Sequence, residues 1–171
     1  GISFTLTQLN QAGALVHVYT DGSVLVNHGG TEMGQGLNTK VAQVVAEELG
    51  VDLKHVRSSA TDTSKVPNTS ATAASTGTDL NGKAAQVAVR KIKAALADFA
   101  ADHYGCDAAE VRFADNHVEC GDKACIPFPE FVQKAHANRI PLWSSGFYRT
   151  PKIHYDTETL TGRPFYYFVY A

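Results

Sequence analysis

The sequence predicts an α+β fold in which a mixed or antiparallel sheet of hairpins carries helices packed on one of its faces. Two β-rich runs joined by an Asp-Gly turn predict a hairpin, and three later stretches repeat apolar residues at helical spacing. The elements follow the order ββ, α, β, α, ββ, α and then extended strands. The 171 residues, 44% of them hydrophobic, provide apolar material for one ordinary core.

The first hairpin is expected from residues 14–19 and 24–28, because Asp21-Gly22 between two β-rich runs is a strong hairpin signal. It leads directly into residues 29–36, which contain four glycines in eight positions. Such a stretch cannot form a regular helix or strand, but it can bring backbone amides close to a ligand. We call residues 29–36 the glycine loop.

Two helices follow at intervals. The first is expected over residues 38–49, with Asn38 as its N-cap and Gly50 as its stop. The second is expected over residues 78–103. Their apolar residues at helical spacing are Leu37, Val41, Val44, Val45 and Leu49 for the first and Ala85, Val89, Ile92, Leu96 and Phe99 for the second.

The remaining elements are shorter. A strand over residues 56–60 leads into residues 61–76, an irregular stretch rich in hydroxyl side chains that we call the hydroxyl loop. After the second helix, the sequence predicts a hairpin of residues 107–113 and 117–120 that turns at Asp115-Asn116, a helix over residues 127–138, and a strand over residues 165–171. We expect one partial domain over residues 1–171, with possible sub-lobes 1–104 and 105–171.

Charge and composition exclude several classes of function. The 15 basic and 17 acidic residues give a net charge of −2 and form no basic stripe, so we expect no nucleic-acid partner. No run approaches the roughly 20 apolar residues that cross a bilayer, and residues 1–4 do not resemble a signal peptide, so we expect a cytoplasmic protein without membrane contact. The missing initiator Met and the β-rich end predict a piece of a longer protein.

Cysteines and histidines give weak signals. Cys106, Cys120 and Cys125 are odd in number and contain no CxxC, so they indicate neither a disulfide framework nor a zinc site. We expect a structural role for them, with Cys120 and Cys125 as a reduced pair beside a turn. The seven histidines are scattered without metal-ligand spacing, and we expect most of them on the surface or half-buried with satisfied partners.

The glycine loop and the hydroxyl loop are the candidate binding elements, because each leads into a helix N-terminus with unpaired N–H donors and a partial charge of about +0.5. Gln35 can donate and accept hydrogen bonds at one edge of a heterocycle, and the hydroxyls of the second loop suit phosphate oxygens or a pterin ring. The alternative is that both loops only cap helices or stay solvated. Glu32 could be a base, but an acceptor that orders the loop is the simpler interpretation.

Several motifs resemble the xanthine dehydrogenase family of molybdenum hydroxylases over essentially the whole chain. They include His-Gly-Gly-Thr-Glu-Met-Gly-Gln-Gly at 28–36, Val-Pro-Asn-Thr-Ser-Ala-Thr-Ala-Ala-Ser at 66–75 and Ser-Gly-Phe-Tyr-Arg-Thr-Pro at 145–151. Met-Gly-Gln-Gly at 33–36 is similar to a motif of the wider family, including aldehyde oxidoreductases, whereas Phe-Tyr-Arg-Thr-Pro at 147–151 looks specific to xanthine dehydrogenases. The resemblance implies a fragment of the C-terminal, cofactor-binding region of the large subunit.

The resemblance also implies a molybdenum–molybdopterin cofactor and a set of binding residues. Gln35 would contact the cofactor, and Met33, Gly34 and Gly36 would place the backbone. Further contacts would come from Thr69, Ser70, Thr72, Ala73 and Ser75. No residue would ligate the metal directly, because the pterin dithiolene holds molybdenum. The family's catalytic glutamate lies in a Gly-Glu-Pro-type motif that this sequence lacks, so the isolated chain is expected to be inactive and to bind little cofactor.

For the whole enzyme, the resemblance implies oxidation of hypoxanthine and xanthine to urate with water as the oxygen source. Electrons would pass through 2Fe-2S clusters and FAD to NAD. The expected partners are a purine substrate, the FAD and iron–sulfur subunit or domain, the remainder of the large subunit, and further copies in a homo-oligomer. Three alternatives stay open: an aldehyde or other N-heterocycle oxidoreductase of the same family, a non-catalytic phosphate- or nucleotide-binding domain, and a structural module with solvated loops.

Overall fold

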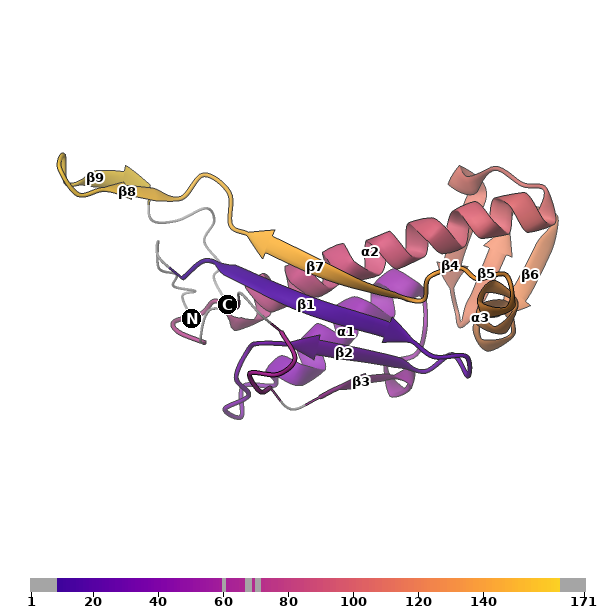
Figure 1. The fold of residues 1–171 in the computed structure, drawn as a ribbon, viewed down its shortest axis with the longest axis horizontal. Helices are drawn as coiled ribbons and strands as arrows, with labels where there is room; N and C mark the ends of the chain where they lie inside the picture. Colours follow the sequence, from indigo (N-terminus) through magenta and orange to yellow (C-terminus); the bar gives the residue numbers. More distant parts are fainter. Residues whose placement is uncertain (1–8, 60, 67–68, 70–71, 164–171) are drawn as a thin grey trace.

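The computed structural model describes residues 9–59, 61–66, 69 and 72–163. Its main sheet has four strands in the order β3-β2-β1-β7 (Figure 1). The strands are β1 (Gln11–Val18), β2 (Val24–His28), β3 (Val56–Ser58) and β7 (Trp143–Arg149). β1 pairs antiparallel with β2 and β7, while β2 and β3 run parallel, so the sheet is mixed, as predicted.

Helices α1 (Leu37–Leu49) and α2 (Gly77–Tyr104) cover the same face of this sheet (Figure 1). The residues of β1 and β2 that point toward the helices are almost all buried alanines and valines, which fits the alternation of a sheet with one covered face. α2 lies directly on the backbone of β7, because a Cβ built on Gly146 would be 2.0 Å from the carbonyl oxygen of Ala84. The predicted α+β architecture with helices on one face is therefore confirmed.

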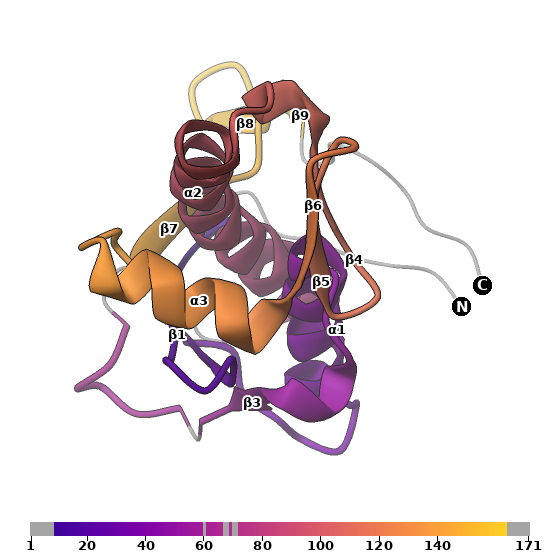
Figure 2. The same ribbon diagram turned by 90° about the vertical axis from the view of Figure 1, so that its right-hand side faces the viewer.

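A second sheet lies beside the far end of α2 (Figure 2). Its three antiparallel strands are β4 (Val111–Ala114), β5 (His117–Cys120) and β6 (Ala124–Pro127), and they are followed by α3 (Phe128–Ala137). The ring of Phe131 in α3 lies 5.6 Å from that of Phe99 in α2 and 6.4 Å from that of Phe113 in β4. These aromatic contacts join α3 and the second sheet to the core around α2.

The turn between β4 and β5 connects the second sheet to the end of α1. Asp115 and Asn116 both have positive φ, at 50° and 62°, as a type I′ hairpin turn requires. The backbone amide of Asn116 donates to the carbonyl of Gly50 at 2.7 Å, and its side-chain oxygen accepts from the amide of Asp52 at 2.8 Å. The predicted turn at these two residues is confirmed. Through Asn116 it also forms hydrogen bonds with Gly50 and Asp52, the residues that follow α1.

Both hairpin predictions and all three helix predictions are confirmed, with helix ends within one residue of those expected. Four details are wrong. β1 begins at Gln11, three residues before the predicted start of the first hairpin. Gly36, with φ of 76°, is the N-cap of α1 in place of Asn38. Residues 108–110 form a 3-10 turn before β4, as do Leu53–His55 before β3. β3 ends at Ser58, short of the predicted residue 60.

Other elements were not predicted individually. β6 was missed, and β8 (His154–Asp156) and β9 (Thr161–Arg163) form a separate two-stranded ribbon. The predicted strand at residues 165–171 lies outside the described residues, and the division into sub-lobes stays a prediction. Cys106, Cys120 and Cys125 are free thiols, and burial raises the pKa of Cys120 to about 11. Among the described residues, no helix is long and apolar enough to cross a membrane.

Candidate functional site

The glycine loop and the hydroxyl loop lie against each other at the end of the sheet where α1 and α2 both begin (Figure 1). The backbone amide of Thr31 in the glycine loop donates to the hydroxyl of Thr72 in the hydroxyl loop at 2.7 Å. The Thr61 hydroxyl donates to the carbonyl of Gly30 at 2.8 Å. A Cβ on Gly29 would be 2.2 Å from Thr69, so the two loops touch without room for another side chain.

The two helix starts are neighbours. Gly77 opens α2, and a Cβ built on it would lie 3.4 Å from the side chain of Leu37, the first residue of α1. A Cβ on Gly30 would be 2.5 Å from Leu37 and 2.7 Å from the side-chain nitrogen of Asn81. The glycine loop therefore passes between the first turns of both helices. Gly30, Leu37 and Asn81, which are far apart in the sequence, meet at this point.

Glu32 caps α1. Its Oε1 accepts hydrogen bonds from the amides of Gly34 at 2.9 Å and Gly36 at 3.0 Å, and its Oε2 accepts from the amide of Asn38 at 3.0 Å. The bond from Asn38 is the main reason that the pKa of this exposed carboxyl is below its ordinary value of 4.5. The expectation of a loop-ordering acceptor is confirmed. Its negative charge also occupies amides that an incoming anion would otherwise use at α1.

The prediction that Asn38 is the N-cap of α1 is wrong, because Glu32 supplies the carboxylate that accepts from the first amides of the helix. The carboxylate of Glu32 reaches the amide of Asn38 from outside the helix, so Asn38 lies within the first turn. The start of α2 is different, because Thr76 makes no side-chain hydrogen bond to the helix and donates its hydroxyl to the carbonyl of Ala73 at 2.7 Å. Both helix starts nevertheless carry a carboxylate among the described residues: Glu32 from the loop before α1, and Asp79 in the first turn of α2, whose Oδ1 accepts from the amide of Leu80 at 2.8 Å.

Gln35 has both ends of its side-chain amide engaged within the glycine loop. Its Oε1 accepts from the amide of Met33 at 2.6 Å, and its Nε2 donates to the carbonyl of Thr31 at 2.8 Å. Met33 is 68% exposed at the tip of the loop. A Cβ on Gly34 would meet nothing within 4 Å, so open space surrounds this part of the backbone. The loop tip is accessible to a ligand, and its shape is held by the loop's own side chains.

The hydroxyl-loop candidates have different surroundings. Thr69 is half-buried and accepts from the amide of Gly13 at 3.1 Å. Thr72 contacts the glycine loop, Ala73 accepts from Thr76, and Ser75 is exposed. Ser70 lies outside the described residues. The structure thus brings Thr69 and Thr72 to the glycine loop, and it leaves Ser75 on the surface beside the start of α2.

His28 was missed as a candidate. His28 is 2% exposed, so it departs from the expectation that most histidines lie on the surface or half-buried. Its Nδ1 accepts from the amide of Gly30 at 3.2 Å. The alternation of Val24, Val26 and His28 along β2 could have revealed it, because residues two apart in a strand point to the same face of the sheet.

Replacing Glu32 by alanine is expected to accelerate hydrogen exchange at the amides of Gly34, Gly36 and Asn38, because these amides lose their acceptor. Since the pKa of Glu32 is lowered, its contribution is complete above its ordinary value of 4.5 and is lost as the pH falls through the folded-state pKa. Hydrogen exchange followed by mass spectrometry measures both effects. Glu47→Ala, on the exposed side of α1, is the control, and equal exchange in both variants would contradict this capping role.

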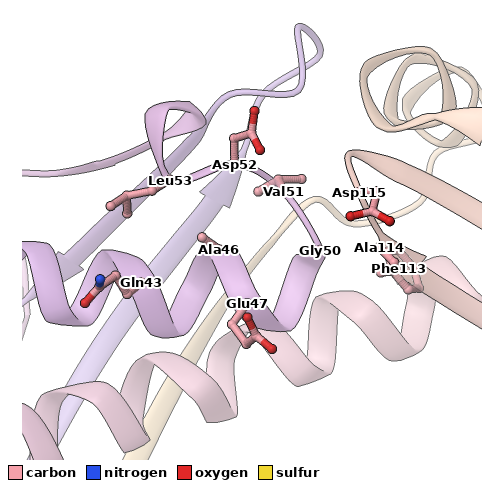
Figure 3. Close-up of a pocket in the computed structure, with 10 residues that line it drawn as sticks. All are labelled: Gln43, Ala46, Glu47, Gly50, Val51, Asp52, Leu53, Phe113, Ala114 and Asp115. Carbon is pink, nitrogen blue, oxygen red and sulfur yellow. The ribbon is translucent and has the colours of Figure 1, made fainter.

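A separate cavity of about 520 Å³ lies between the end of α1 and the turn after β4 (Figure 3). Gln43, Ala46 and Glu47 line it from α1, and Phe113 and Asp115 line it from the β4 side. It contains none of the candidate residues of the two loops. Its acidic side chains together with the carboxyl end of α1 make it unsuitable for an anionic cofactor.

Comparison with known proteins gives a family match over the whole chain. The family profile of the molybdopterin cofactor-binding domain matches residues 1–171. The xanthine dehydrogenase/oxidase of Rattus norvegicus is 45% identical over 171 residues, which are 100% of this chain and 11% of that protein. The xanthine dehydrogenase of Oryza sativa subsp. japonica gives the same identity and coverage.

Solved structures agree in fold. The reconstituted CO dehydrogenase from Oligotropha carboxidovorans superimposes with a TM-score of 0.74 at 23% identity, over 88% of this chain and 22% of that chain. The chain therefore spans about a tenth of the length of the curated relatives and about a fifth of this neighbour. With a family match over its whole length, and with two helix-entry loops in contact as the resemblance implies, this chain belongs to the molybdopterin cofactor-binding domain family.

Proposed function

We propose that this chain is part of a xanthine dehydrogenase-type molybdenum hydroxylase that oxidises hypoxanthine and xanthine to urate with water as the oxygen source. Its role is to supply two loops that hold the cofactor. The observation that carries the proposal is the contact between the glycine loop and the hydroxyl loop at Thr31 and Thr72, at the shared start of α1 and α2. The 45% identity to xanthine dehydrogenases over all 171 residues supports the choice of substrate class.

The residues present suit a phosphate-bearing pterin. The backbone near Gly34 is surrounded by open space, and Gln35 at the same tip can exchange its internal hydrogen bonds for bonds to a heterocycle edge. Thr72 and Thr69 place hydroxyls beside this loop. Thr76 gives α2 no side-chain cap, but Asp79 places a carboxylate in its first turn as Glu32 does beside α1, so neither helix start alone is favoured as the place for the phosphate. Met33, Gly36, Ser70, Ala73 and Ser75 complete the proposed contacts.

Molybdenum held by the pterin dithiolene supplies the centre for hydroxylation and two-electron transfer when it is bound. This chain contributes binding and orientation and no catalytic base. Glu32 does not suit the part of a base, because three backbone amides donate to its carboxylate and its pKa is lowered. The resemblance implies a base in a Gly-Glu-Pro-type motif that this sequence lacks, so we assign the proton acceptor to another part of the enzyme.

The proposed partners follow from the same assignment. They are a purine substrate, a subunit or domain with 2Fe-2S clusters and FAD, NAD as the electron acceptor, the remainder of the large subunit, and further copies in a homo-oligomer. Trp143 and Phe147 on β7, 61% and 51% exposed, offer an apolar surface that suits contact with the remainder of the subunit. The free thiols suit the reducing cytoplasm, which we propose as the location.

Gln35→Ala in the full-length enzyme is expected to weaken cofactor retention about tenfold, which corresponds to roughly 1.4 kcal/mol. The variant removes both the donor and the acceptor that would contact the pterin. Molybdenum per subunit, measured by mass spectrometry after gel filtration, should fall, and hydroxylase activity should fall with it. Gln43→Ala, an exposed glutamine on α1 away from the loop tip, is the control and should keep full molybdenum content.

A second variant separates cofactor contact from loop collapse. Gln35→Glu keeps an oxygen that can accept from the Met33 amide but loses the donor group. Because its second carboxylate oxygen would face the carbonyl of Thr31 and adds a negative charge, this variant should lose molybdenum, and hydrogen exchange of residues 29–36 shows whether the loop has also opened: molybdenum loss with unchanged exchange assigns the loss to cofactor contact. Full molybdenum content in Gln35→Ala would leave the proposed role of Gln35 without support.

A further inference from the structure

We propose that His28 is a positioning residue that holds the glycine loop against the first turns of α1 and α2. The positioning role itself does not depend on the proposed function. Only the predicted effect of His28 variants on cofactor retention rests on that function. Its structural part depends on the contacts of His28, Gly30 and Asn81, which surround the point where the loop leaves the sheet.

His28 occupies an unusual position for a histidine. It is the last residue of β2, lies opposite Ala14 of β1, and follows Val24 and Val26 on the covered face of the sheet. All seven histidines of the chain are described, and His28 is the only buried one. A position of this kind normally holds an aliphatic residue, so the imidazole is there at a cost in desolvation that its contacts must offset.

The ring makes one defined hydrogen bond, and this bond fixes its tautomer. Nδ1 accepts from the backbone amide of Gly30 at 3.2 Å, so the proton of the neutral ring is on Nε2. The side-chain amide of Asn38 in α1 lies near the ring and favours its protonated form. Nε2 has no partner at ordinary hydrogen-bonding distance within the described part of the chain. Through its place in β2, its hydrogen bond with Gly30 and its proximity to Asn38, the ring connects the sheet, the glycine loop and α1.

Gly30 transmits this connection to both helices. It leaves no room for a side chain, because Leu37 of α1 and Asn81 of α2 lie 2.5 Å and 2.7 Å from where its Cβ would be. Asn81 is 3% exposed and donates from Nδ2 to the carbonyl of Gly77 at 2.7 Å, in the first turn of α2. The hydroxyl of Thr61 lies within hydrogen-bonding distance of the carbonyls of both His28 and Gly30, so its single proton can be donated to either. A shift of Gly30 would therefore disturb both helix starts.

The contact of His28 with Gly30 requires a neutral ring. Burial lowers the pKa of His28 below 6.5, while the Asn38 side chain and the Glu32 carboxylate oppose this shift. Protonation at Nδ1 would remove the acceptor for Gly30 and place a charge in the core. Below pH 6.5 the unfolded state binds more protons at His28 than the folded state does. The contribution of the neutral ring to the free energy of unfolding is therefore complete above pH 6.5 and is lost as the pH falls below that value.

Three substitutions in the full-length enzyme test the proposal. His28→Asn places an amide oxygen near the position of Nδ1 and keeps the acceptor for Gly30. His28→Gln extends its amide toward the position of Nε2 and loses that acceptor. His28→Leu keeps the volume without any polar atom. Hydrogen exchange of residues 29–36 at pH 7, corrected for intrinsic rates, should be about tenfold faster in the Gln and Leu variants and near the wild-type rate in the Asn variant.

The pH dependence gives a second readout. Wild-type protection of residues 29–36 should decline as the pH falls below 6.5, while the Asn variant should show no such decline because its side chain does not titrate. If the Leu variant does not fold, the comparison of Asn with Gln decides. Equal exchange in the Asn and Gln variants, or the same pH profile in the Asn variant and the wild type, would overturn the positioning role.

Molybdenum content separates this proposal from the proposed function. Under both proposals, the Gln and Leu variants exchange faster and also lose molybdenum, while the Asn variant retains it. Faster exchange with unchanged molybdenum content would support the positioning role of His28 and count against cofactor binding by the glycine loop. Unchanged exchange with reduced molybdenum would overturn the positioning role and leave cofactor binding intact.

Discussion

Replacing Gly146 by alanine is expected to destabilise the protein by at least about 3 kcal/mol, at or above the upper end of the usual overpacking cost. The new Cβ would lie 2.0 Å from the carbonyl oxygen of Ala84 and 2.6 Å from the amide nitrogen of Ala88. Both are backbone atoms of α2, so no side-chain rotation can relieve the overlap. Either β7 must leave its pairing with β1 or the long helix must move away from the sheet.

Gly82→Ala is the matched control, because it adds the same methyl group to α2 on the side that meets α1. Its Cβ would lie 3.6 Å from Val44, an ordinary contact, and alanine in a helix interior is favoured over glycine by up to about 1 kcal/mol. Urea denaturation followed by circular dichroism should show a lower midpoint for Gly146→Ala and an equal or higher one for Gly82→Ala. Similar midpoints for the two variants would show that the contact of β7 with α2 is looser than described.

The local elements of the fold could be predicted because their signals are local. The Asp21-Gly22 and Asp115-Asn116 turns, and the apolar spacing of α1 and α2, lie within short windows of sequence. The pairing of β1 with β7 joins residues such as Leu15 and Ser145, far apart in the chain, and no window contains both. β6 was missed because its four residues carry little β pattern and are held by β5 beside them.

The candidate site likewise has features that local sequence predicts and features that depend on tertiary contacts. Composition identifies the glycine loop and the hydroxyl loop as irregular segments before helices, and the resemblance implies that residues of both contact one cofactor. The sequence predicts the cap of α1 at Asn38 because asparagine is a preferred N-cap residue, whereas in the structure Glu32 folds back from the loop to the first amides of the helix. The alternation of Val24, Val26 and His28 places the histidine on the same face of β2 as two valines, so this local pattern is sufficient to predict its burial.

Replacing Gly50 by alanine is expected to cost at least about 3 kcal/mol as well, for two independent reasons. Gly50 ends α1 with φ of 62°, a left-handed conformation that costs an L-residue roughly 1–2 kcal/mol. Its Cβ would also lie 2.3 Å from the carbonyl carbon and oxygen of Phe113 in β4. Because the amide of Asn116 donates to the carbonyl of Gly50, a shift here would also separate the second sheet from α1.

Gly105→Ala isolates the conformational part of this cost. Gly105 ends α2 with φ of 73°, yet a Cβ there would meet nothing within 4 Å, so only the left-handed strain of roughly 1–2 kcal/mol applies. The difference between the two variants in urea denaturation therefore measures the overlap with β4. If Gly50→Ala lost no more stability than Gly105→Ala, the backbone of β4 would have to yield freely, and the second sheet would be only loosely attached to the end of α1.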